Sequence, residues 1–533
     1  MKFKTGVSLV ALAIVGSLLV GCNSDNKQDD EQTNASSGVW LKGDIHVHTA
    51  VSQDARSPLS DVLDKAFNSF GLDYVSISNH MRNNSQDNDD NDVGGLLYNE
   101  ALTRYELPAV AALRAEQYAN KLIFSSFEWD MPTHEHYGIG IVWDEATQAQ
   151  GLAAVKEFEY RFSNKNELSD FDAADVSRWE TAGVLRQNQT HQDGVAALAW
   201  LEQNFPHSSF GMLNHPRRYG SSYTIEDIRD LNNAAPDVFF LIEGMVGNQF
   251  NGHRGDYAGS SFDGVYGGVD PAVAQVGGWW DALLGEGRKI WNVANSDHHF
   301  KTRDSNASGY YPGEYAKTFT WVEGVTEQDK PISAQKLLDA MHTGNMWGTY
   351  GDLIDVLDFT AAGNSDNAIT MGQTLTTKAG EQVTITIRFK SPDTNNREAV
   401  VNNEIYDAAN PGVDHVDLIV GDVGTLAQPG SSEYSNQTNA SAHVVRSFSA
   451  DDWTVDSEGY ASMSYTFTAA KHQYFRLRGT NLAYNVTGVT ANGEPQRSAD
   501  VDGTDANYFE LLNERNYADL WFYSNPLYVE VQP

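Results

Sequence analysis

Cysteine is nearly absent from this chain. Only Cys22 occurs among 533 residues, so no intramolecular disulfide can form. Positive charge is also scarce, because 36 Lys and Arg stand against 72 Asp and Glu, which gives a formal net charge of −36. A surface this acidic repels a phosphate backbone, so nucleic acid is not expected as a general partner. The charge still allows a small anionic substrate that is held by local metal ions.

Long apolar runs are missing as well. The longest, residues 7–20, is too short for a membrane span, and no other candidate span is visible. The chain of 533 residues is too long for a single core, which predicts two or more domains. Hydrophobic residues make up 41% of the chain, as in an ordinary globular protein.

The N-terminus has the features of an export signal. Lys2 and Lys4 precede the apolar run of residues 7–20. The run ends in Leu19-Val20-Gly21-Cys22, which resembles the lipobox of bacterial lipoproteins, where cleavage before the cysteine leaves its thiol to carry lipid. The alternative is an ordinary signal peptide with an incidental cysteine.

The lipobox resemblance implies a location. We expect residues 1–21 to be a lipoprotein signal peptide, Cys22 to be lipidated, and residues 22–38 to form a flexible, polar tether. Asn23 after the cysteine resembles enteric lipoproteins of the outer membrane. The protein is therefore expected to be lipid-anchored in the cell envelope, at the outer membrane, facing the periplasm or the cell surface.

Between residues 39 and 351, short apolar strands alternate with amphipathic helices. Strands are predicted at residues 42–49, 74–77, 122–124, 137–142, 210–213, 238–242 and 289–293, and helices at 57–70, 105–119, 194–203, 225–231 and 279–284. Repeated strand–helix units favour a parallel sheet, in particular a barrel. In such folds the chemistry takes place at the carboxyl ends of the strands.

The pattern changes beyond residue 352. Apolar and polar residues alternate with period two at 383–389, 416–420, 463–467, 474–477 and 527–531, and helical periodicity is nearly absent. Residues 352–533 are therefore predicted to form an all-β, sandwich-like accessory domain. A structural role is favoured for it over carbohydrate binding, because no candidate site gathers there.

Two histidines end the first predicted strand. His46 and His48 are two residues apart, so in a strand they face the same side. Neutral imidazole is the commonest nitrogen ligand for zinc, iron or manganese. The same His-x-His pattern recurs in His134-Glu135-His136, so the pattern alone is weak evidence of a metal site. His46 and His48 indicate one only if later residues complete a coordination shell.

Later residues do supply such a shell. Most of the candidate donors fall at or next to a predicted strand end, and the full set is His46, His48, Asp54, His80, Glu128, His136, His215, Asp297 and His299. Asp54 lies in a loop. His136 is favoured over His134 because it directly precedes the strand at 137–142. Without cysteine ligands, nitrogen and oxygen donors suit zinc, manganese or iron.

In order and spacing these segments resemble the PHP family, the polymerase and histidinol phosphatase metallophosphoesterases. The matching segments are Gly43-Asp44-Ile45-His46-Val47-His48-Thr49, Ser52-Gln53-Asp54, Ser78-Asn79-His80, Glu128, His136-Tyr137-Gly138-Ile139-Gly140, Asn214-His215-Pro216 and Ser296-Asp297-His298-His299. The resemblance covers about residues 40–350. It implies a distorted (β/α)₇ TIM-like barrel, the PHP fold, that holds two or three divalent metal ions.

The resemblance also assigns the ligands. His46, His48, Glu128 and Asp297 would hold one metal; Glu128, His136 and His215 a second; Asp54, His80 and His299 a third. Asn79 departs from the family, whose members usually carry Asp at that position. Because Asn has no charge, the support of His80 and of the third metal is in doubt.

The implied reaction is attack of metal-bound hydroxide on a phosphomonoester or phosphodiester, so the partner is a small phosphorylated substrate. Glu128, Asp297 and His299 are the predicted catalytic residues, and Arg82, Arg217 and Arg218 the predicted phosphate-binding residues. For each arginine, the alternative is charge balance on an acidic surface.

Two other functions compete with this one. The same barrel could act as a metallohydrolase on another bond, such as an amide or lactone. Alternatively, the chain could be a surface glycan-binding lipoprotein with a relic barrel, in which residues 355–533 are the active part. The complete donor set favours a phosphoric ester hydrolase over both.

Overall fold

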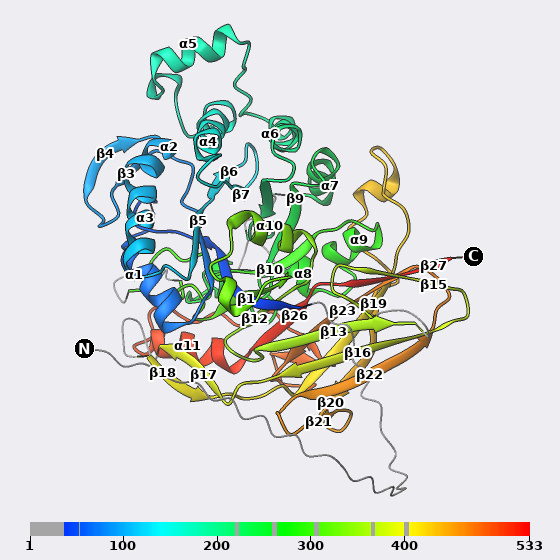
Figure 1. Ribbon diagram of the computed structural model, residues 1–533. Coiled ribbons are helices and arrows are strands. Elements are labelled where there is room, and N and C mark those ends of the chain that lie inside the picture. Colours follow the sequence, from blue (N-terminus) through cyan, green and yellow to red (C-terminus); the bar gives the residue numbers. More distant parts are fainter. Residues whose placement is uncertain are drawn as a thin grey trace, which may run out of the picture. The chain divides into compact units, whose positions relative to one another are not determined.

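Most strands between residues 38 and 350 belong to two large sheets, shown in the computed structural model in Figure 1. The structure describes residues 37–52, 54–218, 223–257, 264–302, 309–363, 368–398 and 405–532. The signal peptide, Cys22 and nearly all of the predicted tether lie outside these residues. Residues Ser36–Pro533 form one compact unit. In the described part of the chain, no helix is both long and apolar enough to cross a membrane.

The first sheet has parallel neighbours at its N-terminal strands. They are β1 (Gly38–Val47), β2 (Tyr74–Ile77) and β5 (Leu122–Ser125), and the sheet continues antiparallel through β11 (Ala316–Glu323) and β12 (Met346–Tyr350). The strands predicted at 42–49, 74–77 and 122–124 are confirmed. Residues of β2 are buried throughout, as expected for a strand covered on both faces.

The second sheet has the order β10-β9-β8-β7-β6. Its strands are β6 (Phe127–Asp130), β7 (His136–Ile141), β8 (Ser209–Leu213), β9 (Phe239–Met245) and β10 (Trp291–Ala294). Strand β7 runs antiparallel to both of its neighbours, whereas β8, β9 and β10 are parallel. The amino end of β7 therefore lies with the carboxyl ends of β6 and β8.

The two sheets meet at isolated bridges. Val47 at the end of β1 pairs with His298 after β10, and His80 after β2 pairs with Glu128 in β6. Among the described residues, the pairing is not continuous and no closed barrel forms, so the predicted (β/α)₇ barrel is not confirmed. The structure is a mixed α/β protein. Sequence periodicity located seven strands of these sheets but not β6, β11 or β12. It does not tell which strand each one pairs with or in which direction.

All five predicted helices are present. They are α1 (Leu59–Asp64), which continues as the π-helix η1 (Lys65–Ser69), α3 (Leu107–Glu116), α6 (His191–Asn204), α7 (Ile225–Ala234) and α9 (Trp279–Gly285). Thr190 and Thr224 cap α6 and α7, each in a reciprocal capping box with an Asp three residues on. The caps satisfy amide donors that would otherwise be unpaired at the helix starts.

The C-terminal region is rich in β-structure. One sheet contains β13 (Val356–Ala362), β16 (Gln382–Lys390) and β22 (Ala461–Thr468). The strands β19 (His415–Asp422), β23 (Gln473–Thr480), β26 (Trp521–Ser524) and β27 (Leu527–Gln532) belong to the same sheet as β1. They join it where β26 pairs with β12. The predicted boundary at residue 351 stays a prediction, and across it one sheet is continuous.

The prediction that this region is all-β is wrong in one element, the helix α11 (Tyr508–Ala518). Its buried side chains include Asn513 and Asn516 as well as Leu512. Polar residues on the buried face remove the apolar periodicity by which an amphipathic helix is recognised. The helix therefore left no signal in the sequence pattern.

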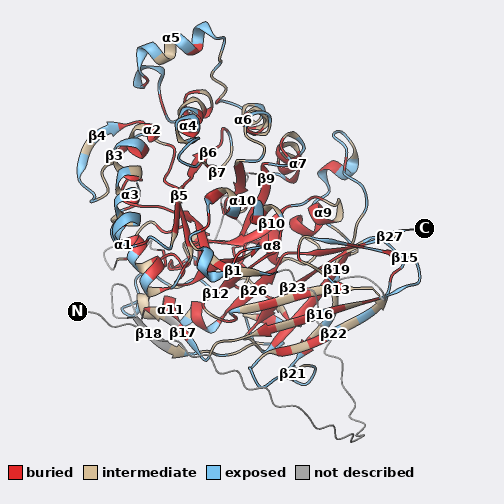
Figure 2. Ribbon diagram, in the orientation of Figure 1, coloured by how far each residue is buried: buried red, intermediate tan, exposed pale blue. Residues whose placement is uncertain are grey.

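The remaining elements complete the fold. They are β3 (Asn84–Gln86), β4 (Asp92–Leu96), α2 (Tyr98–Ala101), the π-helix η2 (Leu102–Glu106), α4 (Gln148–Phe162), η3 (Leu168–Asp170), α5 (Ala173–Thr181), η4 (Arg254–Asp256), α8 (Pro271–Ala274), η5 (Glu327–Asp329), α10 (Ala334–His342), β14 (Ile369–Thr370), β15 (Thr374–Lys378), β17 (Thr394–Glu398), β18 (Ile405–Ala409), η6 (Ser432–Ser435), β20 (His443–Ser449), β21 (Thr454–Val455), β24 (Thr490–Ala491) and β25 (Glu494–Pro495). Figure 2 shows the central strands buried and α5 largely exposed.

Candidate metal centre

The predicted donors converge where the two sheets meet. His46 and His48 stand at the end of β1, His80 follows β2, and His215 follows β8. Asp297 follows β10, and His136 is the first residue of β7. Glu128 is the exception, because it does not follow a strand but lies inside the short strand β6. The convergence follows from the direction of the strands, including the reversed β7.

Two of these donors occupy left-handed backbone conformations. His215 has φ of 27° and Asp297 has φ of 48°, values that residues other than glycine rarely adopt. Such strain persists only where the surrounding structure holds it, and it concentrates at functional sites. In both cases the unusual turn directly follows a strand and places the side chain in the cluster.

The carboxylate of Glu128 lies at the centre of the cluster and is fully buried. Ring nitrogens surround it at 3.2 Å (His46 Nε2 to Oε1), 3.2 Å (His48 Nε2 to Oε2), 3.3 Å (His80 Nδ1 to Oε2), 3.1 Å (His136 Nδ1 to Oε1) and 3.3 Å (His215 Nε2 to Oε1). Each carboxylate oxygen thus faces at least two imidazoles. This is the arrangement expected of a carboxylate that bridges metal ions.

Asp297 completes a four-donor group with His46, His48 and Glu128. Its Oδ1 lies 3.1 Å from His46 Nε2 and 3.4 Å from His48 Nε2. One ligand atom from each of the four residues lies within 4.8 Å of the others, and all four are buried. A tetrahedral shell with metal–ligand bonds of about 2.0–2.1 Å has ligand–ligand separations of about 3.3 Å. The measured separations match that spacing.

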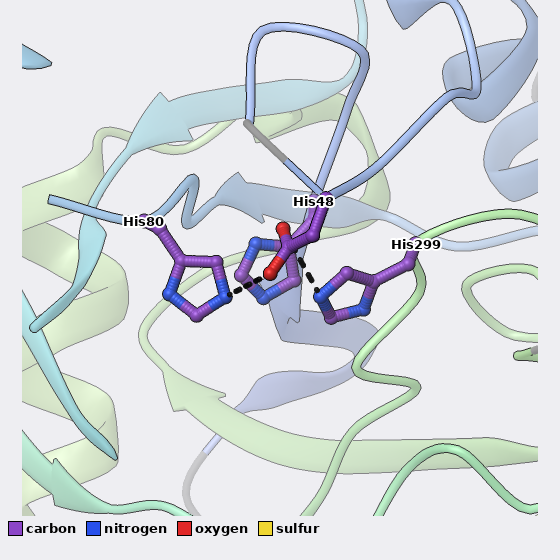
Figure 3. Close-up of side chains that lie close together, drawn as sticks. His48, His80 and His299 are labelled. Atoms are coloured by element: carbon purple, nitrogen blue, oxygen red, sulfur yellow. Dashed lines mark ion pairs between the residues drawn. The ribbon is translucent and has the colours of Figure 1, made fainter. Parts of the chain in front are cut away.

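A second group lies beside it. His80 Nε2 is 3.1 Å from Asp54 Oδ2, and His299 Nε2 is 3.6 Å from Asp54 Oδ1. The structure adds His48 to this group, and the rings of His48, His80 and His299 lie around one point in Figure 3. The Asp54 side chain is 40% exposed, so this group reaches solvent.

Several buried donor atoms in the cluster have no hydrogen-bond partner among the described residues. They are His48 Nε2, His80 Nδ1, His215 Nε2, Glu128 Oε2 and Asp297 Oδ1. Buried polar atoms are nearly always paired, because leaving one unpaired costs about 1–3 kcal/mol. These atoms face one another, so the donor set fits divalent metal ions with nitrogen and oxygen ligands.

The charge states suit metal binding. Burial would raise the pKa of Glu128, but the neighbouring His136, His46 and His80 hold it well below its usual range. Burial lowers the pKa of His80 to about 4, and burial together with Arg218 lowers that of His215 to about 3. At neutral pH the carboxylate is therefore ionised, and these two rings are neutral with a lone pair free to coordinate.

Two other rings gain basicity from the carboxylates. Burial would lower the pKa of His136, but Glu128 raises it to about 9. Burial would also lower the pKa of His46, but the carboxylates of Glu243, Asp297 and Glu128 raise it well above its usual value. Both rings are protonated while they face only carboxylates, so a metal ion must displace a proton from each.

Residues outside the predicted set orient the ligands. Glu243 Oε1 lies 2.9 Å from His46 Nδ1, and Asn295 donates to the same oxygen at 3.1 Å. Asn214 donates to Glu128 Oε1 at 2.7 Å. Metal-binding histidines commonly donate their second ring N–H to a carboxylate, which fixes the tautomer. The only sequence signal for Glu243 was its place after a predicted strand, and it proves to lie inside β9.

Asn79 supports the end of β1 and not the ring of His80. Its Oδ1 accepts from the Thr49 backbone N–H at 2.8 Å, and its Nδ2 donates to Glu106 Oε2 at 2.8 Å. Glu106 is fully buried, and burial raises its pKa to about 7. A carboxyl group is therefore present next to this position, although Asn79 itself is uncharged.

The three predicted arginines differ in place. Arg218 Nη1 donates to Asp297 Oδ2 at 2.9 Å. Arg82 donates to Asp130 at 2.6 and 2.7 Å and to Asp54 Oδ2 at 3.3 Å, and one of its nitrogens lies 2.9 Å from His136 Nε2. Arg217 lies over the Trp279 ring, 4.8 Å from its centroid. Two of the three thus contact the donor cluster directly.

The two histidines of the His134-Glu135-His136 triplet point to different places. His136 faces Glu128, whereas His134 Nε2 lies 2.8 Å from His191 Nδ1 on α6. Glu135, not predicted as a site residue, has Oε2 3.7 Å from His136 Nδ1 and groups with His136 and His215. His298 is buried and directed away from the cluster, toward Ser57 Oγ at 2.9 Å.

Comparisons with known proteins give little beyond this geometry. No family model matches the chain, and no curated protein matches it. A solved structure that resembles it is a two-domain protein from Bacteroides vulgatus containing a predicted PHP-like metal-dependent phosphoesterase. The two sequences are 12% identical, and the structures superpose with a TM-score of 0.34. The alignment covers 89% of this chain and 98% of the Bacteroides chain. A likeness this weak carries no argument for the fold or the reaction.

Proposed function

We propose that this protein is a metal-dependent phosphoesterase of the PHP type. The observation that carries the proposal is the buried carboxylate of Glu128, which has five imidazole nitrogens within 3.1–3.3 Å. Support also comes from the sequence motifs, whose order and spacing resemble the PHP family. The proposed fold of residues 39–351 is a distorted (β/α)₇ barrel, with residues 352–533 as an accessory domain.

The proposed ligands fall into three groups, for two or three ions of zinc, manganese or iron. They are His46, His48, Glu128 and Asp297; Glu128, His136 and His215; and Asp54, His80 and His299. Ions bound there would lower the pKa of a coordinated water and stabilise negative charge on a phosphate. Glu128, Asp297 and His299 are proposed as catalytic residues in this sense, as ligands that face the reacting groups.

The chain's own residues prepare the site. Arg218 and Asn248 both donate to Asp297 Oδ2 at 2.9 Å, which leaves Oδ1 facing His46 and His48. Glu243 fixes the ring of His46 from behind. These contacts hold the donors in place before any substrate arrives, so little reorganisation is needed during the reaction.

Arg82 is the proposed first contact for phosphate. Its side chain is 21% exposed and lies between Asp54 and Asp130, next to His136. A guanidinium in this position can offer paired N–H donors to a phosphate. Arg218, which is 3% exposed, is proposed to act from within the cluster. Arg217, whose guanidinium lies over the Trp279 ring, is also proposed as a phosphate contact.

The proposed location is the cell envelope. The lipobox-like sequence before Cys22 supports lipid anchoring, and Asn23 supports the outer membrane. The substrate would then be a small phosphorylated molecule outside the cytoplasm. Nucleic acid is not proposed as a general partner, given the net charge of −36.

Turnover of matched substrates tests the proposal. The full chain is loaded in turn with zinc, manganese and iron(II), then assayed on aryl phosphomonoesters, phosphodiesters, amides and lactones. We expect phosphoester hydrolysis that falls at least about 100-fold in the His46→Ala/His48→Ala double variant, because the loss of even one residue that supports a ligand costs about 10–100-fold. The exposed His207→Ala variant is the control. Amide or lactone turnover without phosphoester turnover would overturn the proposal.

A further inference from the structure

Another group of histidine and carboxylate side chains lies outside the nine-donor cluster. His134 comes from the loop before β7, His191 is the first residue of α6, and Asp227 lies in the first turn of α7. One ligand atom of each lies within 4.8 Å of the other two. Three segments that are far apart in the sequence thus bring three metal-ligand types to one point.

The separations of these atoms are close to those of a coordination shell. His191 Nδ1 lies 3.5 Å from Asp227 Oδ1 and 2.8 Å from His134 Nε2. Ligands of a tetrahedral zinc ion are about 3.3 Å apart, given bonds of about 2.0–2.1 Å. The distance between His191 Nδ1 and Asp227 Oδ1 is therefore already close to that of two zinc ligands. The nitrogens of His134 and His191 would have to move apart by about half an ångström to reach it.

The other polar atoms of the His191 and Asp227 side chains are held by further groups. His191 Nε2 lies 3.2 Å from Asp230 Oδ2, and Asp230 Oδ1 accepts from the Tyr434 hydroxyl at 2.5 Å. Asp227 Oδ2 accepts from the backbone N–H of Thr224 at 2.8 Å. In a metal-binding histidine, one ring nitrogen usually pairs with a carboxylate while the other nitrogen faces the metal ligands. His191 has this arrangement.

Aromatic packing fixes the third donor. The ring of His134 stacks on Tyr223, with centroids 4.7 Å apart and planes inclined by 7°. The Tyr223 hydroxyl donates to the backbone carbonyls of Glu135 and His136 at 3.1 and 3.3 Å. The stack therefore orients His134 and anchors the loop that also carries His136.

We infer that His134, His191 and Asp227 bind a divalent transition-metal ion of the zinc class. Two imidazoles and one carboxylate suit zinc, and three protein ligands leave a fourth position for water. The His191 and Asp227 side chains are 20% and 21% exposed, so an ion can enter from solvent. This site does not depend on the reaction proposed above.

The ion has a structural consequence. It joins the loop before β7 to the starts of α6 and α7, one residue from Glu135 and two from His136. Through Asp230 and Tyr434 it also connects to η6 of the C-terminal region. The site thus positions the segment that delivers His136 to the main cluster.

Zinc titration of the chelator-stripped full chain tests the inference. The variants are His191→Gln and Asp227→Asn, and the control is His207→Gln, an exposed histidine with the same substitution. We expect both site variants to bind one equivalent of zinc fewer than the parent, and the control to bind as many as the parent. Equal stoichiometry in all four proteins would overturn the site.

Two further measurements keep the test decisive if a variant misfolds. Asp230→Asn should weaken the binding of that one equivalent by about 10–100-fold, because it removes the carboxylate that orients His191. In crystals of the zinc-loaded parent, an anomalous peak is expected between His134 Nε2, His191 Nδ1 and Asp227 Oδ1. Absence of that peak shows a hydrogen-bonded histidine pair without metal and contradicts the inference.

Discussion

Glu243 Oε1 lies 2.9 Å from His46 Nδ1, and both side chains are fully buried. This contact directs the opposite nitrogen of His46, Nε2, toward Glu128 and Asp297. We predict that Glu243→Ala lowers metal affinity by about 10–100-fold, because the ring loses the partner that fixes its tautomer. Glu243→Gln should restore most of it, since the amide oxygen still accepts from the ring.

Competition with a chromogenic chelator measures this affinity. Circular dichroism at the same temperature checks that each Glu243 variant is folded. If Glu243→Ala binds metal as tightly as the parent while folded, the orienting role of Glu243 is wrong.

A second prediction concerns pH. Burial raises the pKa of Glu106 to about 7 from an ordinary value of 4.5, against hydrogen bonds from Ser125 and Asn79. The folded state therefore binds a proton more tightly than the unfolded state. This contribution to stability is complete below about pH 4.5 and is lost as the pH rises through 7.

The Glu106→Gln variant removes that titration. Between pH 4.5 and 7 its free energy of unfolding should fall less steeply than the parent's, by up to about 1.4 kcal/mol per pH unit. Urea unfolding at half-unit pH steps measures the difference, and the exposed Glu323→Gln variant is the control. Parallel curves for parent and Glu106→Gln would contradict the assigned pKa.

A third prediction tests how the C-terminal region is joined to the rest. Arg476 on β23 forms two hydrogen bonds to Asp281 on α9, at 2.8 and 2.7 Å, with both side chains fully buried. Arg476→Met should destabilise the protein by about 3–5 kcal/mol, because the buried carboxylate of Asp281 loses its cation and keeps only hydrogen bonds from the Tyr474 hydroxyl and the Gly277 backbone N–H. Arg446→Met, in a half-exposed pair with Asp452, should leave the urea midpoint unchanged.

The double variant Arg476→Met/Asp281→Leu separates charge from packing. If the loss comes from the unpaired carboxylate, the second substitution recovers much of it. If the double variant is as unstable as Arg476→Met alone, the account of this contact is wrong.

The sequence predicted where the donors lie along the chain better than how they are supported. Strand ends, one loop residue and the family resemblance together gave the nine candidate donors, and the structure brings their side chains together. Their role as metal ligands stays a prediction. Glu243 is 197 residues from His46, and His191 is 57 residues from His134. Local periodicity carries no information on such pairings, so the orienting carboxylate and the second histidine site were not predicted.

The fold shows the same limit. Apolar runs located the strands β2, β8 and β10, but only the structure shows that β5 and β6, separated by Ser126 alone, belong to different sheets. It also shows that β7 runs antiparallel to its neighbours. Strand direction and pairing are set by tertiary contacts, which a single sequence does not reveal.

A fourth prediction concerns the N-terminus. If the lipobox-like segment is processed, Cys22→Ser abolishes labelling by a radioactive fatty acid and releases the protein from the membrane fraction. The cause is the loss of the thiol that carries the lipid. Unchanged membrane association in the Cys22→Ser variant would show that no lipid is attached at this residue.

Metal binding by the cluster around Glu128 underlies the whole proposed function. Its most direct test is an anomalous-scattering measurement on crystals of the full chain, at the zinc, manganese and iron edges. We expect at least one peak between Glu128, His46, His48 and Asp297, and another beside His136 and His215. A well-ordered cluster that shows no peak at any of the three edges, after metal loading, would contradict it.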